Sequence, residues 1–425
     1  MAGDAPSHLH FGEPRCPGWG DPKRGSWHSP GETVVATRTS DVVIVGGGVM
    51  GSAVAYFLRA EGDTGRVLVV ERDLTYRHAS SGLSVGGIRQ QYGTAINIQL
   101  SRASLAFYEQ FPERMEVRGD RPDITLRQRG YLFLVDAAHW PIMQRWHRIQ
   151  REHGVEVVLL APEEARTFVP DLSLDGIHGA SFGWRDGTLD PSGVLQGFVR
   201  KARALGVEYL EDEVIGIGIV GGRVAGVTTR RSGIIASGVV VNAAGPWAGA
   251  VARLAGVRLP VEPVRRQVYV FEPERALSYD LPLVIDESGI YFRHEPGGRV
   301  LTGRSFADDP HAFDFTWDRD RFFTGIWPDL ARRMPCFHQL RLERGWAGLY
   351  DMNVVDHNAI LGAHPEVGGF FCIAGFSGHG FQQAPAAGRG VAELIRSGRF
   401  LTLDLSPLTP ARFATGALLL EEAVI

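Results

Sequence analysis

The spacing of apolar positions near the start of the patterned chain predicts a strand, a helix and a second strand. Residues 42–45 form a continuous apolar run, which is typical of a strand buried on both faces of a parallel sheet. Val54, Phe57 and Leu58 then recur at helical spacing. A second apolar run covers residues 67–70. The pattern therefore begins with a β-α-β unit.

The middle of the chain carries a longer module of the same kind. A helix is expected over residues 192–204, with a short strand near Val207. Strand patterns continue through residues 214–227, and an apolar run over 239–241 ends the module. This order predicts a β-α-β meander whose last strand returns to the first sheet.

The last strong pattern is a strand, a glycine-rich turn and a helix. The apolar strand begins at residue 371 and ends in the turn GFSGHG, residues 375–380. Small or apolar residues recur at Ala384, Ala387 and Val391, so a helix should follow. Its N-terminus would point at whatever lies above the turn.

Three glycines follow the first apolar run in the spacing GxGxxG. Gly46 permits a tight turn, Gly48 lets the backbone approach a pyrophosphate, and Gly51 lets the helix pack closely on the strand. Val49 and Met50 begin the helix, whose free N–H groups and positive dipole end would face the phosphates. The full strand, glycine, helix and strand context predicts a dinucleotide site.

An acid completes this fingerprint at the end of the second strand. Glu71 is placed to accept hydrogen bonds from a ribose diol. Arg72, beside it, is interpreted as a contact to the adenosine phosphate or ribose, with a surface cation as the alternative. The motif alone does not separate NAD from FAD.

Three later segments favour FAD. Residues 77–89 are small and hydroxylated, with Ser80, Ser81, Gly86 and Gly87 among them, so backbone amides can close on phosphate, ribitol and ring. A freely exchanging NAD seldom needs so long a cradle.

The second segment is the turn that follows the strand at 239–241. Ala243, Ala244 and Gly245 give this turn no bulk, as a close cofactor contact requires. Trp247 follows and is expected to pack against the adenosine half or the junction between lobes.

The third segment is the SGHG turn before the last helix. Aimed at the pyrimidine edge of a flavin, the helix dipole would stabilise the negative charge of the reduced ring. His379 in this turn either holds the turn or acts as a proton donor or electrostatic stabiliser at the N1–O2 edge, and we favour a flavin contact over acid–base catalysis.

Composition narrows the partners. The 425 residues are 44% hydrophobic and 22% charged, with a net charge of −4, so no broad electrostatic attraction to nucleic acid or anionic lipid is expected. The basic pairs at 230–231 and 265–266 are interpreted as solvated faces or ligand contacts. Cys16, Cys336 and Cys372 lie far apart, which argues against a disulfide framework and a metal site.

The first 39 residues are rich in Gly, Pro, Ser and His and lack an apolar core. They resemble neither a signal peptide nor a transit peptide, and we interpret them as a polar arm. No apolar run approaches the about 20 residues that a membrane span needs. No transmembrane segment is expected, and a cytoplasmic location is the default.

Taken with the segments LSVGGIRQQY, LPVEPVRRQVYVF and GFSGHGFQQAPAAGRGVAELI, these motifs give the chain a clear resemblance. It resembles the DAO-type flavoproteins, which include D-amino-acid, glycine and sarcosine oxidases and dimethylglycine dehydrogenase. The resemblance covers about residues 40–400 and implies an α/β (α+β) fold of GR2/DAO type. A Rossmann-type FAD-binding domain would be combined with an antiparallel-sheet substrate domain.

The resemblance also implies how the chain divides. Strand patterns at residues 266–271 and 289–293 agree with an antiparallel substrate sheet. After the polar arm, 1–39, the FAD-binding domain would use 40–115, 181–258 and 344–425, and the substrate domain 116–180 and 259–343.

The motifs and the resemblance together assign a role to each candidate site residue. Arg89, Arg293 and Arg304 are candidates for a substrate carboxylate, with a solvated strand face kept as the alternative for Arg304, and Tyr291 would bond a substrate or shape the pocket. The catalytic assignment is Arg89, Tyr291, Arg293 and His379. The cofactor contacts assigned are Gly46, Gly48, Val49, Met50, Gly51, Glu71, Arg72, Ser80, Ser81, Gly86, Gly87, Val214, Ala243, Ala244, Gly245, Trp247, Gly348, Gly375, Gly378, His379, Gly380, Phe381 and Gln382.

Two acids after the last long strand stay open between two roles. Asp351 and Asp356, in LYDMNVVDHN, are turn-capping acids or a base near the substrate, and the cap is favoured.

Departures from the family pattern suggest how the flavin is used. A lysine that follows the SGHG-Phe element in sarcosine-oxidase-like members is replaced by Gln382, and a second, oxygen-activating lysine aligns near Leu301. Loss of cations near the flavin should slow its reaction with oxygen, so we expect a dehydrogenase that passes electrons to another acceptor, with weak oxidase activity. The cysteine used for covalent attachment aligns near Gly348, and His78 is about one residue out of register with the attaching histidine, so we predict non-covalent FAD.

Three functions are compatible with these residues and with the resemblance. The first is oxidation of the C–N bond of a secondary or tertiary amine or amino acid by hydride transfer to flavin N5, with electrons passed to a protein, a quinone or oxygen. The second is a non-catalytic, FAD-bound assembly factor for a respiratory complex, which one branch of the family suggests. The third is oxidation of a 2-hydroxy acid on the same fold.

Overall fold

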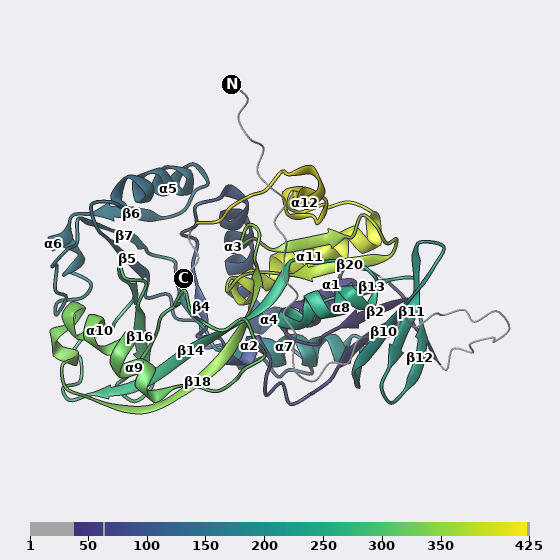
Figure 1. The fold of residues 1–425 in the computed structure, drawn as a ribbon, viewed down its shortest axis with the longest axis horizontal. Coiled ribbons are helices and arrows are strands. Elements are labelled where there is room, and N and C mark those ends of the chain that lie inside the picture. The colour runs from purple at the N-terminus through teal and green to yellow at the C-terminus, as the bar shows by residue number, and fades with distance from the viewer. Residues whose placement is uncertain (1–37, 63, 423–425) are drawn as a thin grey trace, which may run out of the picture.

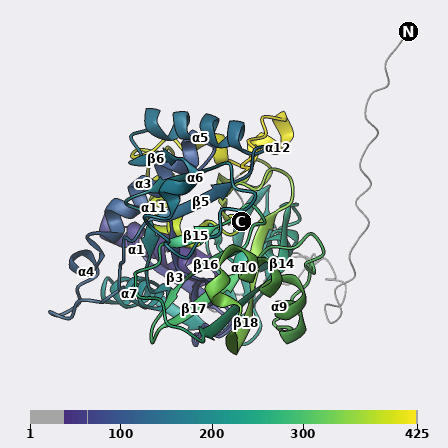
Figure 2. The same cartoon turned by 90° about the vertical axis from the view of Figure 1, so that its left-hand side faces the viewer.

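The computed structural model describes residues 38–62 and 64–422. Two large sheets lie toward opposite ends of the molecule (Figure 1), and Figure 2 looks onto the end that carries the larger one. Of the polar arm expected over 1–39, only Arg38 and Thr39 belong to the described part, and the rest of that prediction falls outside it.

A six-stranded sheet carries the fingerprint. Its neighbouring strands are parallel except for the antiparallel edge pair β19 and β20. In spatial order the strands are β19 (Ile360–Ala363), β20 (Phe370–Ala374), β13 (Val240–Asn242), β2 (Val42–Val45), β3 (Val67–Glu71) and β9 (Glu208–Glu211).

Both faces of this sheet are covered, as the continuous apolar runs predict. Val42 and Ile44 pack on the side of the helices α1 (Val49–Ala60) and α11 (Gly380–Ser397). Val43 and Val45 point the other way, toward α8 (Ala248–Leu254).

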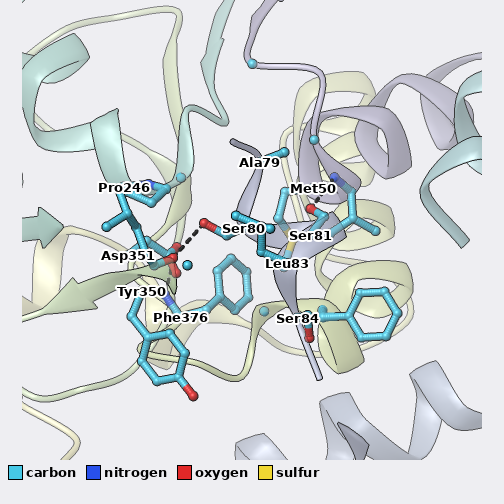
Figure 3. Close-up of a pocket in the computed structure, with 18 of the residues that line it drawn as sticks. Met50, Ala79, Ser80, Ser81, Leu83, Ser84, Pro246, Tyr350, Asp351 and Phe376 are labelled. Carbon is cyan, nitrogen blue, oxygen red and sulfur yellow. Dashed lines mark hydrogen bonds between the residues drawn. The ribbon is translucent and has the colours of Figure 1, made fainter. Parts of the chain in front are cut away.

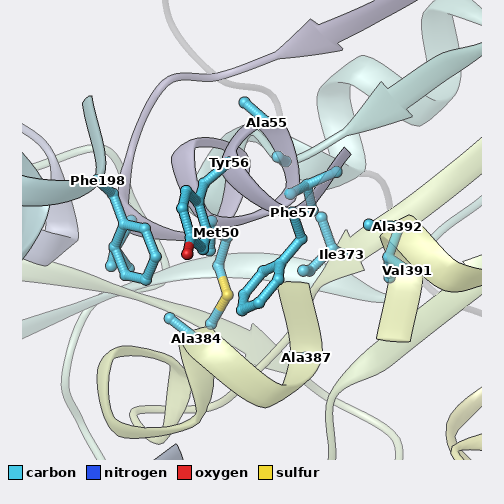
Figure 4. Packing of buried hydrophobic residues seen from close by; sticks show 14 of the residues in the cluster. Met50, Ala55, Tyr56, Phe57, Phe198, Ile373, Ala384, Ala387, Val391 and Ala392 are labelled. Atoms are coloured by element: carbon cyan, nitrogen blue, oxygen red, sulfur yellow. The ribbon is translucent and has the colours of Figure 1, made fainter. Parts of the chain in front are cut away.

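The helical face forms the largest core cluster. Met50, Tyr56 and Phe57 of α1 lie against the small residues of α11 and against Phe198 (Figure 4). A Cβ on Gly388 would come within 2.7 Å of the Cβ of Ala53, so the two helices approach each other closely. This packing fixes where both helices begin, which is where the site lies.

A four-stranded sheet lies beyond α8, in the order β1 (Arg38–Thr39), β12 (Gly233–Ala236), β11 (Arg223–Thr229) and β10 (Val214–Val220). The meander expected over 214–227 is present there. The short strand expected near Val207 is β9, which pairs with β3 in the six-stranded sheet instead.

An eight-stranded sheet forms the other end of the molecule. All its neighbouring strands are antiparallel except β15 and β5, which are parallel. The order is β18 (Leu340–Asn353), β14 (Val261–Pro273), β17 (Arg299–Gly303), β16 (Tyr291–Glu295), β15 (Leu283–Ile285), β5 (Tyr131–Val135), β7 (Gly179–Gly183) and β6 (Val157–Leu160).

The remaining elements connect and cover these sheets. A short ribbon joins β4 (Gly87–Ile88) to β8 (Gly187–Thr188). The other helices are α2 (Ser80–Leu83), α3 (Ala95–Tyr108), α4 (Phe111–Arg114), α5 (Trp140–Glu152), α6 (Pro162–Ala165), α7 (Pro191–Ala204), α9 (Arg319–Gly325), α10 (Trp327–Arg333) and α12 (Ala411–Thr415), with 3-10 turns η1 (Gly245–Trp247), η2 (Pro335–Phe337) and η3 (Ser406–Leu408).

Two of the expected domain boundaries fall inside strands. Strand β7 runs across residue 180, and β18 runs across residue 343. Strands β14 and β18 pair along their whole length, so the chain passes between the two ends of the molecule as a continuous ribbon. The two-domain division itself stays a proposal.

Candidate functional site

A cavity of about 550 Å³ lies at the carboxyl ends of β2, β3 and β13 and extends to the eight-stranded sheet. This is where open α/β sheets bind their ligands. Figure 3 shows part of its wall, with α2, the start of α1 and the end of β18 meeting around it.

The glycine fingerprint forms one wall in the way its spacing predicts. Gly46 has a φ of +98°, and a Cβ there would lie 2.5 Å from the carbonyl oxygen of Ala243. A Cβ on Gly51 would lie 2.0 Å from the carbonyl oxygen of Gly46. At Gly48 the nearest atom would be the Ser81 Oγ, 3.4 Å away, so this backbone faces open cavity.

The start of α1 offers backbone N–H groups to the cavity. Its N-cap, Gly48, supplies no side-chain cap, and the Val49 N–H donates to the Ser81 Oγ at 3.0 Å. A helix N-terminus that follows a glycine turn is a ready anion site.

Glu71 lines the cavity but also supports the fingerprint turn. Its Oε2 accepts from the Gly47 N–H at 2.7 Å and its Oε1 from the Asp73 N–H at 3.1 Å. Burial raises the pKa of Glu71, although these hydrogen bonds oppose the shift. The carboxylate therefore holds the turn while it lines the cavity, and its contact with a ribose stays a prediction.

A column of rings closes the same end of the cavity. The guanidinium carbon of Arg72 lies 3.6 Å from the centre of the Trp247 ring, a cation–π contact. Trp247 stacks on Phe313 at 4.9 Å between centroids, and the rings of His78 and Phe315 are 4.3 Å apart. Trp247 lines the cavity within this column, and its expected role at the adenosine half or the lobe junction stays a prediction.

The SGHG turn supplies the opposite wall. Gly378 has a φ of +94°, and a Cβ there would strike the Tyr350 ring at 2.4 Å. His379 is buried and precedes α11, which has no side-chain cap either. Gln382 accepts from the Arg89 N–H at 2.7 Å and donates to the Tyr92 hydroxyl, so it ties α11 to the cradle segment.

The end of β18 reaches the cavity beside α2 (Figure 3). The Ser80 hydroxyl donates to the Leu349 carbonyl at 2.6 Å. Asp351 lines the cavity, and its Oδ2 accepts from the Phe376 N–H at 3.1 Å. Asp351 therefore caps the turn before α11, and burial raises the pKa of this acid to about 6.

The raised pKa makes a pH prediction. The folded protein holds a proton on Asp351 between about pH 4 and 6 that the unfolded chain has released, so the free energy of unfolding falls as pH rises through this window. We expect the stability difference between wild type and D351N to fall by about 2 kcal/mol from pH 4.5 to 7, measured by urea unfolding with FAD in excess. A pH-independent difference would show that Asp351 is ionised throughout.

The second acid of this segment has a different place. The Asp356 carboxylate forms a buried bidentate pair with Arg412 at 2.7 and 2.9 Å. Asp356 does not line the cavity. This position favours the turn-capping role over that of a base near the substrate.

Most of the assigned cofactor contacts line this cavity. Those that do are Gly46, Gly48, Val49, Met50, Glu71, Arg72, Ser80, Ser81, Gly87, Val214, Ala243, Ala244, Gly245, Trp247, Gly348, Gly378, His379, Gly380, Phe381 and Gln382. Gly51, Gly86 and Gly375 lie behind the lining, where added Cβ atoms would meet Gly46, Leu189 and Ile360.

The four residues assigned to catalysis do not all reach the cavity. Arg89, Tyr291 and His379 line the cavity, and Arg293 does not. The Arg293 guanidinium is held by Glu295 at 2.7 Å and by the Val85 carbonyl at 2.9 Å. Arg304 likewise pairs with Asp329, at 2.9 Å, away from the cavity.

One cation of the lining, Arg266, has no specific role predicted from the sequence. It comes from β14 and lines the cavity with Tyr350 of the paired strand β18, and its guanidinium carbon lies 5.2 Å from the Tyr350 ring centre. The only sequence signal was its membership of a basic pair. Arg266 reaches the cavity because β14 pairs with β18, whose end also lines it.

The structure was also searched for metal-binding clusters and for membrane-spanning helices among the described residues. No group of three or more His, Cys, Asp or Glu among them could hold a metal ion. None of the helices described is both long and apolar enough to cross a membrane.

Comparison with known proteins identifies the family. Residues 41–394 match the family described as DAO, FAD dependent oxidoreductase. The chain belongs to this family. It is similar to FAD-dependent oxidoreductase domain-containing protein 1 of Xenopus laevis, with 40% identity over 91% of this chain and 85% of that protein. Sarcosine oxidase subunit beta of Rhodobacter capsulatus is 26% identical over 88% of each chain.

A solved structure shows the same fold. The L-proline dehydrogenase from P. horikoshii superposes with a TM-score of 0.81 and 30% identity, covering 90% of this chain and all of that one. The predicted DAO-type α/β fold is thus confirmed, as is FAD as the cofactor of the family.

The cavity lining fits FAD on its own terms. The Gly48 backbone leaves open space in front of a helix N-terminus, as a pyrophosphate needs. Glu71, the Arg72–Trp247 pair and the SGHG turn all line this cavity, so it offers the groups expected at both ends of an FAD molecule.

Non-covalent binding gives a direct prediction. His78 lines the cavity, whereas Cys336 and Cys372 do not. Precipitating the FAD-loaded protein with trichloroacetic acid should leave nearly all the yellow colour in the supernatant, measured by absorbance. Colour kept in the pellet would contradict this, and loss of that colour in H78A would identify the attachment.

Proposed function

We propose that this protein oxidises the C–N bond of a secondary or tertiary amine or of an amino acid. FAD, when bound, accepts the hydride from the carbon next to nitrogen. The family assignment supports oxidoreductase chemistry, and the finer proposal rests on how the cavity continues beyond the cofactor cradle.

One observation carries the proposal. Past the SGHG turn, the cavity reaches the eight-stranded sheet, where Tyr131, Tyr291 and Arg266 line it beside Leu283 and Ile285. We name these five residues the sheet end of the cavity. Apolar walls with a few polar groups are typical of small-molecule sites. The names of two relatives, an oxidase of sarcosine and a dehydrogenase of L-proline, support a secondary amino acid.

The residues of the chain would bind and orient both partners. The N-terminus of α1, Glu71 and the Arg72–Trp247 pair would hold the nucleotide half of FAD. The N-terminus of α11 would support the flavin, because its positive end favours negative charge there. The sheet end would exclude water and hold the substrate.

The experiment is anaerobic flavin reduction, followed by absorbance near the flavin band. The panel contains N-methyl amino acids, imino acids and 2-hydroxy acids. Bleaching by the first two classes supports the proposal, and bleaching by hydroxy acids alone replaces it with the C–OH reaction. No bleaching at one FAD per chain would favour the non-catalytic assembly role.

We also propose that oxygen is a poor acceptor. The two positions that carry lysines in sarcosine-oxidase-like proteins are Leu301 and Gln382 here, so neither supplies a cation. Leu301 is buried in a cluster with Val268 and Val270. Gln382 forms hydrogen bonds with Arg89 and Tyr92. Protein reduced with dithionite should react with oxygen within about tenfold of the rate of free reduced FAD, measured by stopped flow. An enhancement of a hundredfold or more would contradict this.

A further inference from the structure

Asp186 is a buried acid behind the wall of the cavity. It lies between β7 and β8, is 1% exposed and does not line the cavity. A carboxylate is costly to take out of water unless N–H groups and a nearby cation offset its charge. The groups around Asp186 therefore indicate what its charge does.

Both oxygens of Asp186 accept hydrogen bonds from the segment that follows Arg89. Oδ1 accepts from the Gln90 N–H at 2.8 Å, and Oδ2 accepts from the Gln91 Nε2 at 2.9 Å. The Gln91 side chain is fixed in turn, because its Oε1 accepts from the Ser181 hydroxyl at 2.6 Å. The carboxylate thus holds both glutamines in place from behind.

Arg89 is the cation that belongs to this acid. Its Nη1 donates to the Gln91 carbonyl at 2.6 Å, so a single residue joins the guanidinium to Asp186. Its Nη2 lies 3.4 Å from the His379 Nε2. Arg89 lines the cavity and Asp186 does not, so the cation is the member of the pair that faces a bound cofactor.

The two charges oppose each other at the tyrosines around them. Burial raises the pKa of the hydroxyl groups of Tyr92 and Tyr131. The charge of Arg89 opposes that shift, and the charge of Asp186 adds to it. Burial also raises the pKa of Asp186 to about 6, although two hydrogen bonds and the charge of Arg89 act against the shift. The acid is therefore ionised at pH 8 and protonated at pH 4.5.

A charge pair at this place acts on a redox cofactor without touching its reacting atoms. A cation beside a flavin stabilises the negative charge of the reduced ring, and an anion nearby has the opposite effect. Such interactions reach further in a water-excluded interior than in solvent. Asp186 can therefore act from behind the wall.

We propose that Asp186 is the buried counter-charge of Arg89, and that the two residues together set the reduction potential of FAD bound in the cavity. Arg89 raises the potential and Asp186 lowers it. The inference requires bound FAD but no particular substrate, so it goes beyond the reaction proposed above.

The test compares the midpoint potential of FAD in wild type and D186N, measured by anaerobic reduction against a reference dye at pH 8. This substitution removes the charge and keeps the shape. The new carboxamide can accept from the Gln90 N–H, and the Gln91 amide can turn over to accept from its NH2 group.

The matched control is D286N. Asp286 is a second buried acid, accepts from the Ser288 N–H at 2.9 Å and forms an ion pair with a buried arginine, but it does not line the cavity. A loss of buried charge that acts only on the fold would affect both variants alike.

D186N is expected to shift the equilibrium at least fivefold toward reduced FAD, which is about 20 mV for a two-electron couple. R89M should shift it at least fivefold toward oxidised FAD, and D286N should stay within twofold of wild type. At pH 4.5 the acid is protonated in wild type, so wild type and D186N should agree within twofold.

Four results would each overturn the proposal: an unchanged or lower potential in D186N at pH 8, no effect of R89M, an equal rise in D286N, or a D186N effect that persists at pH 4.5. Should D186N or R89M lose FAD, D186S and R89Q remove the same charges and carry the same expectations. The predicted potentials without flavin reduction by any amine would refute the proposed reaction and leave the charge pair standing.

Discussion

Replacing Gly48 with alanine is expected to lower the affinity for FAD about a hundredfold, which corresponds to about 2.7 kcal/mol. The fold should tolerate the change, because the added Cβ would meet no protein atom closer than the Ser81 Oγ at 3.4 Å. The methyl group would instead occupy the space through which a pyrophosphate approaches the backbone. FAD affinity can be measured by fluorescence titration of the stripped protein.

The control is G216A in β10. Its Cβ would also have its nearest contact at 3.4 Å, with Thr228, but Gly216 does not line the cavity. We expect unchanged FAD affinity there and unfolding free energies of both FAD-free variants within about 0.5 kcal/mol of wild type. A G48A protein that binds FAD normally would remove the fingerprint from the cofactor site.

Replacing Arg412 with methionine is expected to cost about 3–5 kcal/mol of stability, because it leaves a buried carboxylate without its cation. The Arg412 and Asp356 side chains are 2% and 1% exposed. Although burial alone would raise the pKa of Asp356, the hydrogen bonds and charge of Arg412 hold it below its ordinary value. Chemical unfolding measures the loss.

An exposed ion pair provides the comparison. Arg341 is 72% exposed and pairs with Glu272 and Glu343 on the surface of the eight-stranded sheet. R341M should change the free energy of unfolding by no more than about 1 kcal/mol. Equal effects of R412M and R341M would mean that the buried pair contributes no more than a surface contact.

The fingerprint was readable from sequence because each of its parts is local. Strand β2, the three glycines, α1, β3 and Glu71 follow one another within one β-α-β unit, so period, turn chemistry and spacing all report on the same contacts. The SGHG turn and α11 were readable for the same reason. The family resemblance added the order in which these pieces form one site.

Other contacts depend on partners far along the chain. The Asp356–Arg412 and Asp309–Arg266 pairs join residues that are 56 and 43 positions apart, so each pair depends on tertiary packing. No local pattern distinguishes such an acid from a turn cap. The sequence therefore left the role of Asp356 open and gave Asp309 none.

Local pattern and the family resemblance together predicted the fold class, the cofactor and most of the residues that line the cavity, because strand, glycine turn and helix follow one another closely in each motif. Tertiary structure decided which arginines face the cavity. Arg293 donates hydrogen bonds to Glu295 and to the Val85 carbonyl, whereas Arg266 lines the cavity beside Tyr350. The choice is tertiary because a strand covered on both faces can carry an arginine on either one, and only strand register and distant acids fix which face opens onto the site.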